Sequence, residues 1–205
     1  MKKSSQNNSQ YTHNNTIFFC EEEVGKIGRK GFYRILNKSA DNHAEDHWAR
    51  KTGKYFSKPQ WLVAFQSTVE TRLQILHYKI LMQIYPTSIL LMRMKVRSTE
   101  LCEKCGTRDS LEHFFYHCNS LRKLWHLVNT HINIVLDRNF ILNWEHALFG
   151  ISSIDNVSKN KLKSINLLIL IAKLTVSKTK YGKSEDPCLV FENELSLRGI
   201  NHTLN

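Results

Sequence analysis

Three cysteines and a histidine lie close together near the middle of the chain, where they could bind a metal ion. Cys102 and Cys105 are separated by two residues, and His113 and Cys118 follow. Structural zinc sites take four tetrahedral ligands, most often thiolates and imidazole nitrogens. The two-residue gap lets a tight turn aim both thiolates at one point, and Gly106 allows the left-handed backbone that such turns often need. We therefore predict that Cys102, Cys105, His113 and Cys118 bind Zn²⁺.

His117 is the alternative nitrogen ligand, because it lies next to Cys118. Asp109 and Glu112 have the spacing of an N-cap pair. This pair predicts a short helix with His113 on its first turn and Cys118 at or just past its end, so that both reach the metal. We do not expect disulfides, because a Cys-x-x-Cys pair with a following His is typical of a metal site and no signal peptide is evident.

A catalytic role is not expected for this cluster. In zinc deaminases a His-x-Glu motif precedes Pro-Cys-x-x-Cys, whereas here the Cys-x-x-Cys pair comes first. Glu112 beside His113 would be the base in such an enzyme, but four protein ligands leave no open position for water. We expect a protein that is not an enzyme and has no small-molecule substrate.

The charge balance indicates an anionic partner. The 205 residues include 29 Lys and Arg against 18 Asp and Glu, which gives a formal net charge of +11. Residues 101–150 are balanced, so the excess lies on both sides of the cysteine cluster. A basic excess is typical of proteins that bind nucleic acid, although a basic surface without a particular partner is the alternative. The candidate contacts to RNA or DNA are Lys79, Arg93, Lys95, Arg97, Arg122 and Lys123.

The apolar pattern predicts a mainly α protein, a small helical domain with a CCHC zinc-knuckle-like segment inserted between helices. Apolar residues recur at steps of three and four from Leu62 to Ile84, which predicts one long helix of about six turns. Tyr85-Pro86 should end it, because the residue before proline avoids helical dihedrals. Further helices are expected over residues 44–55, 89–96, 121–132, 144–149 and 162–176, with a last segment from Pro187.

The domain organisation follows from composition. Residues 1–30 are expected to be disordered or linker, residues 31–150 to form the helical zinc-binding domain, and residues 151–205 to form a C-terminal helical extension. The apolar run from Leu167 to Ala172 is too short to span a membrane. We expect an intracellular protein without membrane contact, with nucleus or cytoplasm left open.

The order of several short motifs is similar to that of a known family. Residues 67–73 (Ser-Thr-Val-Glu-Thr-Arg-Leu), 77–81 (His-Tyr-Lys-Ile-Leu) and 84–87 (Ile-Tyr-Pro-Thr) precede the cysteine cluster. Within it, Leu-Glu-His-Phe-Phe stands before Cys118, and Trp125 follows. This order resembles the zinc-binding region that follows the reverse transcriptase in LINE-type non-LTR retrotransposon polyproteins. The resemblance covers roughly residues 28–198 and is most specific over residues 67–125.

The resemblance implies that the four ligands bind zinc and that the region helps a polyprotein to hold RNA or target DNA. Asn119 departs from the family pattern, since many relatives have proline there. Reverse transcriptases need paired aspartates to hold two metal ions, and this chain has no adjacent Asp-Asp pair. We therefore expect a non-catalytic zinc-binding module, a remnant of a retrotransposon polyprotein. The alternative is a structural or protein-interaction helical zinc module without nucleic-acid binding.

Overall fold

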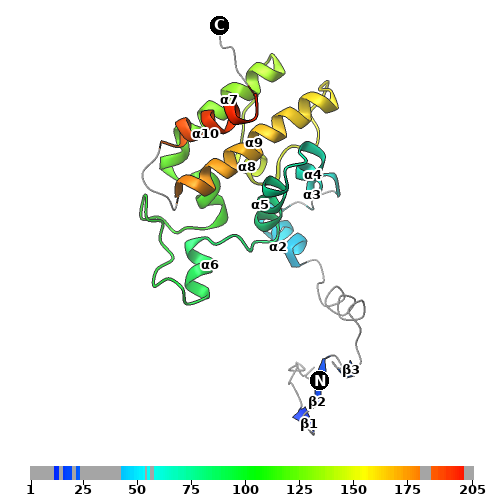
Figure 1. The fold of residues 1–205 in the computed structure, drawn as a ribbon, viewed down its shortest axis with the longest axis vertical. Coiled ribbons are helices and arrows are strands. Elements are labelled where there is room, and N and C mark those ends of the chain that lie inside the picture. Colours follow the sequence, from blue (N-terminus) through cyan, green and yellow to red (C-terminus); the bar gives the residue numbers. More distant parts are fainter. Residues whose placement is uncertain are drawn as a thin grey trace. The chain divides into compact units, whose positions relative to one another are not determined.

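The computed structural model describes residues 43–53, 55, 58–180 and 186–200, together with three short strands before them. The described part is mainly helical, as predicted (Figure 1). The chain divides into two compact units, Met1–Gly53 and Lys54–Asn205.

The first unit contains three short strands and one helix. The strands are β1 (Thr12–His13), β2 (Thr16–Phe19) and β3 (Glu22–Glu23), paired antiparallel in the order β1-β2-β3. They lie within residues 1–30, which we expected to be disordered or linker; the rest of that segment lies outside the described residues. Helix α2 (His43–Thr52) confirms the short helix predicted after residue 43.

The second unit is built from helices and short helical turns. In chain order they are α3 (Lys58–Trp61), α4 (Val63–Ser67), α5 (Thr71–Leu81), α6 (Ser88–Arg93), the π-helical turn η2 (His113–His117), the 3₁₀ turn η3 (Asn119–Leu121), α7 (Arg122–Leu136), α8 (Trp144–Phe149), α9 (Lys159–Lys180) and α10 (Pro187–Leu197). The helices expected around residues 121–132, 144–149 and 162–176 are thus confirmed. No helix among the described residues has the length and apolarity needed to cross a membrane.

Helix α9 forms the centre of the second unit. It packs against α7 and α10 on one side and against α4 and α5 on the other (Figure 1). Its residues from Leu168 to Val176 are all buried, as expected for a helix that is apolar nearly all round. The C-terminal extension that we predicted from residue 151 thus includes α9, and α9 supplies the core on which the preceding helices pack.

The single long helix predicted from Leu62 to Ile84 is wrong, because the chain breaks between α4 and α5. Thr68 has extended backbone dihedrals (φ −152°, ψ 152°), and Val69 is 96 % exposed although it lies on the predicted apolar stripe. The Ser67 hydroxyl donates to the Val63 carbonyl, and the Thr68 hydroxyl accepts from a backbone N–H two residues on. Such side chains compete with helical hydrogen bonds, and this competition explains the break.

Candidate metal centre

A tight hairpin positions the first two cysteines. The Cys102 N–H donates to the Thr107 carbonyl (2.8 Å), and the Gly106 N–H donates to the Cys102 carbonyl (2.8 Å). Gly106 has φ +72°, the left-handed conformation predicted from its position after Cys105. An antiparallel bridge closes the hairpin behind them. The backbone therefore turns back on itself between the two thiols and directs both to the same side.

One π-helical turn positions the other two side chains. The Cys118 N–H donates to the carbonyl of His113, five residues earlier, over 3.1 Å. In an α-helix of 3.6 residues per turn, residues five apart point about 140° away from each other. The wider π turn instead completes roughly one revolution in that distance, so His113 and Cys118 face the same point.

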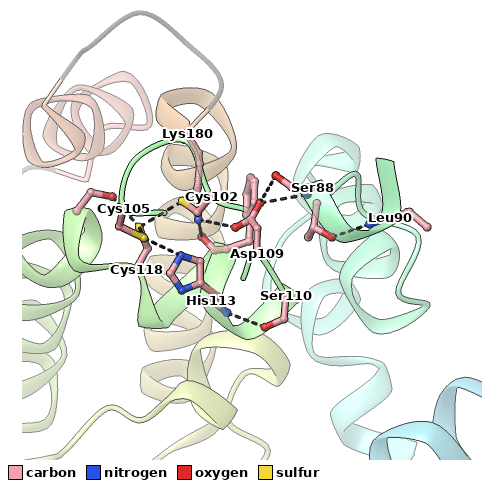
Figure 2. Close-up of polar contacts among 12 residues, drawn as sticks. Ser88, Leu90, Cys102, Cys105, Asp109, Ser110, His113, Cys118 and Lys180 are labelled. Carbon is pink, nitrogen blue, oxygen red and sulfur yellow. Dashed lines mark hydrogen bonds and ion pairs between the residues drawn. The ribbon is translucent and has the colours of Figure 1, made fainter. Parts of the chain in front are cut away.

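The cap of this turn differs from the prediction. The Ser110 hydroxyl accepts from the His113 N–H (3.3 Å), so Ser110 caps the turn in place of Asp109. Asp109 points away from the turn, toward α6 and α9 (Figure 2). The Asp–Glu spacing in the sequence was therefore not a capping pair, because a tertiary contact takes the aspartate.

The four predicted ligands lie together (Figure 2). One ligand atom from each of Cys102, Cys105, His113 and Cys118 lies within 4.8 Å of all the others. The Cys118 Sγ is 3.9 Å from the Cys102 Sγ and 3.8 Å from the Cys105 Sγ, and the Cys105 Sγ is 3.2 Å from the His113 Nε2. Tetrahedral Zn–S bonds of about 2.3 Å would separate two sulfurs by about 3.8 Å. The donor set and its spacing fit a tetrahedral zinc ion.

His117, the alternative ligand, does not belong to this group. Its side chain is exposed, and its ring lies 5.3 Å from the ring of Tyr116 and 6.4 Å from that of Trp144, measured between centroids. The π turn directs His113 toward the thiols and leaves His117 at its far end.

The surroundings of the cluster favour the metal-binding protonation state for some of the ligands but not for all of them. Burial, together with the charge of Lys180, lowers the pKa of His113 and so favours the neutral imidazole that ligates metal. Burial raises the pKa of Cys102. Burial by itself would also raise the pKa of Cys105, but hydrogen bonds from Thr107 outweigh this effect, and the pKa is lowered. Metal binding requires all three cysteine ligands as thiolates and therefore releases protons.

A buried ion pair holds the cysteine segment against the rest of the unit. The Lys180 Nζ donates to the Asp109 Oδ1 (3.1 Å), and the two side chains are 3 % and 1 % exposed. The same Nζ donates to the Phe114 carbonyl (3.3 Å) and lies 4.5 Å from the centre of the Phe114 ring. The Asp109 Oδ2 accepts from the Ser88 N–H and hydroxyl at the start of α6. The sequence did not predict this link, because nothing in it distinguishes Lys180 from the other lysines near the end of the same helix.

The residues predicted to contact nucleic acid come from different elements. Most have exposed side chains, namely Lys79, Arg93, Lys95, Arg122 and Lys123. Arg97 is half-buried instead: its guanidinium donates to the Ser88 hydroxyl (3.0 Å) and pairs with Glu103. The structure also exposes three lysines that were not singled out, Lys159, Lys161 and Lys163 at the start of α9. In the sequence, a lysine at every second position of this polar stretch was the signal that could have identified them.

Comparison with known proteins does not assign the chain to a family. No protein-family model matches it, and no curated protein is significantly similar to it. The structure itself supports a helical domain whose Cys/Cys/His/Cys cluster is able to bind a metal ion, with zinc the best fit to three thiolates and one imidazole.

Proposed function

We propose that this chain is a non-catalytic zinc-binding module that contacts RNA or DNA through its basic surfaces. We further propose that it derives from the region downstream of the reverse transcriptase in LINE-type retrotransposon polyproteins. The observation that carries the proposal is the convergence of four ligand atoms from the hairpin and the π turn. The motif order around that cluster and the net charge of +11 add to it.

The role of zinc in this proposal is structural. Cys102 and Cys105 would hold the ion from the hairpin, and His113 and Cys118 from the π turn that leads into α7. The ion would cross-link the hairpin to the π turn, in addition to the buried ion pair between Asp109 and Lys180. Structural zinc sites contribute about 10–16 kcal/mol of apparent binding energy. This is as large as the whole stability of a typical domain, about 5–15 kcal/mol. With four protein ligands, no position remains for a reacting water.

Nucleic-acid binding is supported by the exposed basic residues. Lys79, Arg93 and Lys95 project from α5 and from the end of α6, and Arg122 and Lys123 from the start of α7. Three lysines in the first turns of α9 oppose the helix dipole, which favours negative charge at that end. Phosphate groups would relieve this unfavourable arrangement by supplying the missing negative charge.

The second candidate function is a protein-interaction module, and one observation favours it. Several large apolar side chains on and after α5 and α6 are at least about one-third exposed, namely Ile75, Tyr78, Met82, Ile84, Met92, Met94 and Val96. Exposed apolar residues in such numbers can mark a protein–protein contact. A module of this kind would hold zinc but bind nucleic acid weakly or not at all.

Metal content tests the structural part of the proposal. Purified protein should carry one zinc ion per chain by inductively coupled plasma mass spectrometry. Cys105→Ser should lose the ion and the folded signal of the second unit, whereas the matched variant His117→Ala should keep both. Loss of zinc in His117→Ala, or a stable metal-free Cys105→Ser protein, would contradict the assignment.

Salt-dependent binding tests the functional part. Affinity for RNA or DNA should fall steeply with salt, because each neutralised phosphate contributes a slope of about 0.7–0.9 in a plot of log affinity against log salt. The double variant Arg93→Gln and Lys95→Gln should make that slope shallower. One zinc per chain without binding of either nucleic acid would favour the protein-interaction module.

A further inference from the structure

A groove opens directly beside the cysteine cluster. It has a volume of about 380 Å³ and lies between the π turn, the first half of α7 and the loop that precedes α8. Cys118 belongs both to the cluster and to the wall of the groove. This volume falls within the range of about 300–1,000 Å³ that is typical of small-ligand sites. A metal ion at the cluster would therefore hold one wall of the groove in place.

Two aromatic rings, each hydrogen-bonded to a backbone carbonyl, line one wall of the groove. The Tyr116 hydroxyl donates to the Leu142 carbonyl (2.7 Å), and the Trp125 Nε1 donates to the Phe115 carbonyl (2.8 Å). The two rings lie 5.5 Å apart between centroids, at an interplanar angle of 44°. Since both rings are tied to backbone carbonyls, a planar ligand would meet a rigid surface and lose little conformational entropy from the protein.

The lining of the groove also includes one exposed apolar side chain. Ile141 lines the groove and is 85 % exposed, although it is a large β-branched side chain. A flat ligand in the groove could cover apolar area on both Ile141 and Tyr116.

The polar groups that line the groove are neutral or cationic. Arg122 and His126 lie four residues apart on one face of α7, and within the described part of the chain neither side chain makes a hydrogen bond or ion pair. The Asn129 Oδ1 accepts from the Leu142 N–H (2.8 Å), which leaves its NH₂ group as a donor with a set direction. The lining contains no Asp or Glu. A guanidinium suits a phosphate, and an amide suits the edge of a base.

We propose that this groove receives one unpaired nucleotide of a single-stranded nucleic acid. The base would lie against Tyr116 and Ile141, with its edge toward Asn129, and the adjoining phosphate would pair with Arg122. Stacking on aromatic side chains together with cationic contacts to the backbone is how proteins hold single strands. A duplex keeps its bases stacked inside and could offer the groove only its phosphates. This site presupposes the proposed nucleic-acid binding and gives it a location and a preference for single strands.

Fluorescence anisotropy on the zinc-loaded full chain tests the site. The probes are a short labelled oligouridylate, the DNA oligothymidylate of equal length, and a duplex of that length. The variants Arg122→Gln and Ile141→Ser alter exposed side chains, so zinc content and circular dichroism should be unchanged. Lys161→Gln, an exposed lysine on α9 outside the groove, is the matched charge control.

The expected pattern distinguishes the groove from a general basic surface. Ile141→Ser should weaken single-strand binding by about 5-fold, because it removes apolar area that the base would cover, at about 25 cal/mol per Å². Duplex binding should be unchanged. Arg122→Gln should reduce the single-strand salt slope by about 0.7. Lys161→Gln should affect single strand and duplex alike.

Three other results would overturn the groove in distinguishable ways. If wild type binds both nucleic acids and neither groove variant changes single-strand affinity more than Lys161→Gln does, the site is wrong while the proposed function stands. If wild type binds neither, the proposed function fails and the site with it. If free uridine monophosphate displaces the oligonucleotide at an equal concentration of nucleotide, the groove takes a free nucleotide and the strand assignment is wrong.

Discussion

Lys173 gives the sharpest test of how the core is assembled. Its side chain is 0 % exposed in the middle of α9, and its Nζ donates to the Leu148 carbonyl (2.6 Å) and lies 2.9 Å from the His77 Nδ1. Burial lowers the pKa of Lys173 well below its ordinary value. Burial, and then the charge of Lys173, lowers the pKa of His77 as well. The native core therefore favours the neutral forms of both groups.

The direction of the pH dependence follows from this lowering. Between the folded pKa of Lys173 and its unfolded value of about 10.4, the unfolded chain binds one proton more than the native chain. The free energy of unfolding must therefore rise with pH throughout that window, by about 1.4 kcal/mol per pH unit. For a domain of this size, 1 kcal/mol shifts the melting temperature by about 2–4 °C, so the expected rise is about 3–5 °C per pH unit. Below about pH 6.5, His77 acts in the same direction.

The perturbation is Lys173→Met, which keeps an unbranched side chain one atom shorter and removes the titrating group. Urea unfolding followed by tryptophan fluorescence, in the range from about pH 8 to pH 10, should show wild type gaining about 1.4 kcal/mol per pH unit over the variant. The control variant Lys161→Met replaces an exposed lysine on the same helix. Its stability should depend on pH as that of wild type does. Parallel curves for wild type and Lys173→Met would refute the reasoning, since the lysine would then titrate alike in folded and unfolded chains.

Two further substitutions, each with a control variant, test the packing and the buried charge within the second unit. Gly150→Ala should destabilise the protein by about 2–4 kcal/mol in chemical denaturation, because φ is +76° there and the new Cβ would lie 2.6 Å from the Val63 Cγ1. The control is Gly199→Ala, at φ +67° with open space around it, which should cost only about 1–2 kcal/mol. Equal losses would mean that the contact with Val63 relaxes freely. Asp109→Asn should cost about 3–5 kcal/mol in zinc-saturated protein, because it leaves Lys180 buried without its counter-charge. Adding Lys180→Met should recover part of that loss, and a double variant no more stable than Asp109→Asn would contradict the ion-pair account.

Local pattern was a reliable guide wherever local physics decides the structure. The hairpin around Gly106 and the end of α8 at Gly150 both depend on left-handed glycine conformations that can be recognised in sequence. The caps were less reliable. Thr87 caps α6 by accepting from the Leu90 N–H, whereas Asp109, which we expected to be a cap, is replaced in that role by Ser110. A carboxylate near a helix start can serve the helix or a distant cation, and spacing alone does not distinguish the two.

The sequence by itself determined the mainly helical class and the four side chains of the cysteine cluster, because ligand spacing and helical periodicity act over a few residues. Only the tertiary structure decided the rest. Whether residues 62–84 form one helix or two depended on hydrogen bonds from Ser67 and Thr68. Which lysines are buried depended on what packs around α9, since Lys173 and Lys180 meet partners 96 and 71 residues away along the chain. The free energy of a buried charge depends on these distant neighbours, and short-range sequence patterns carry no record of them.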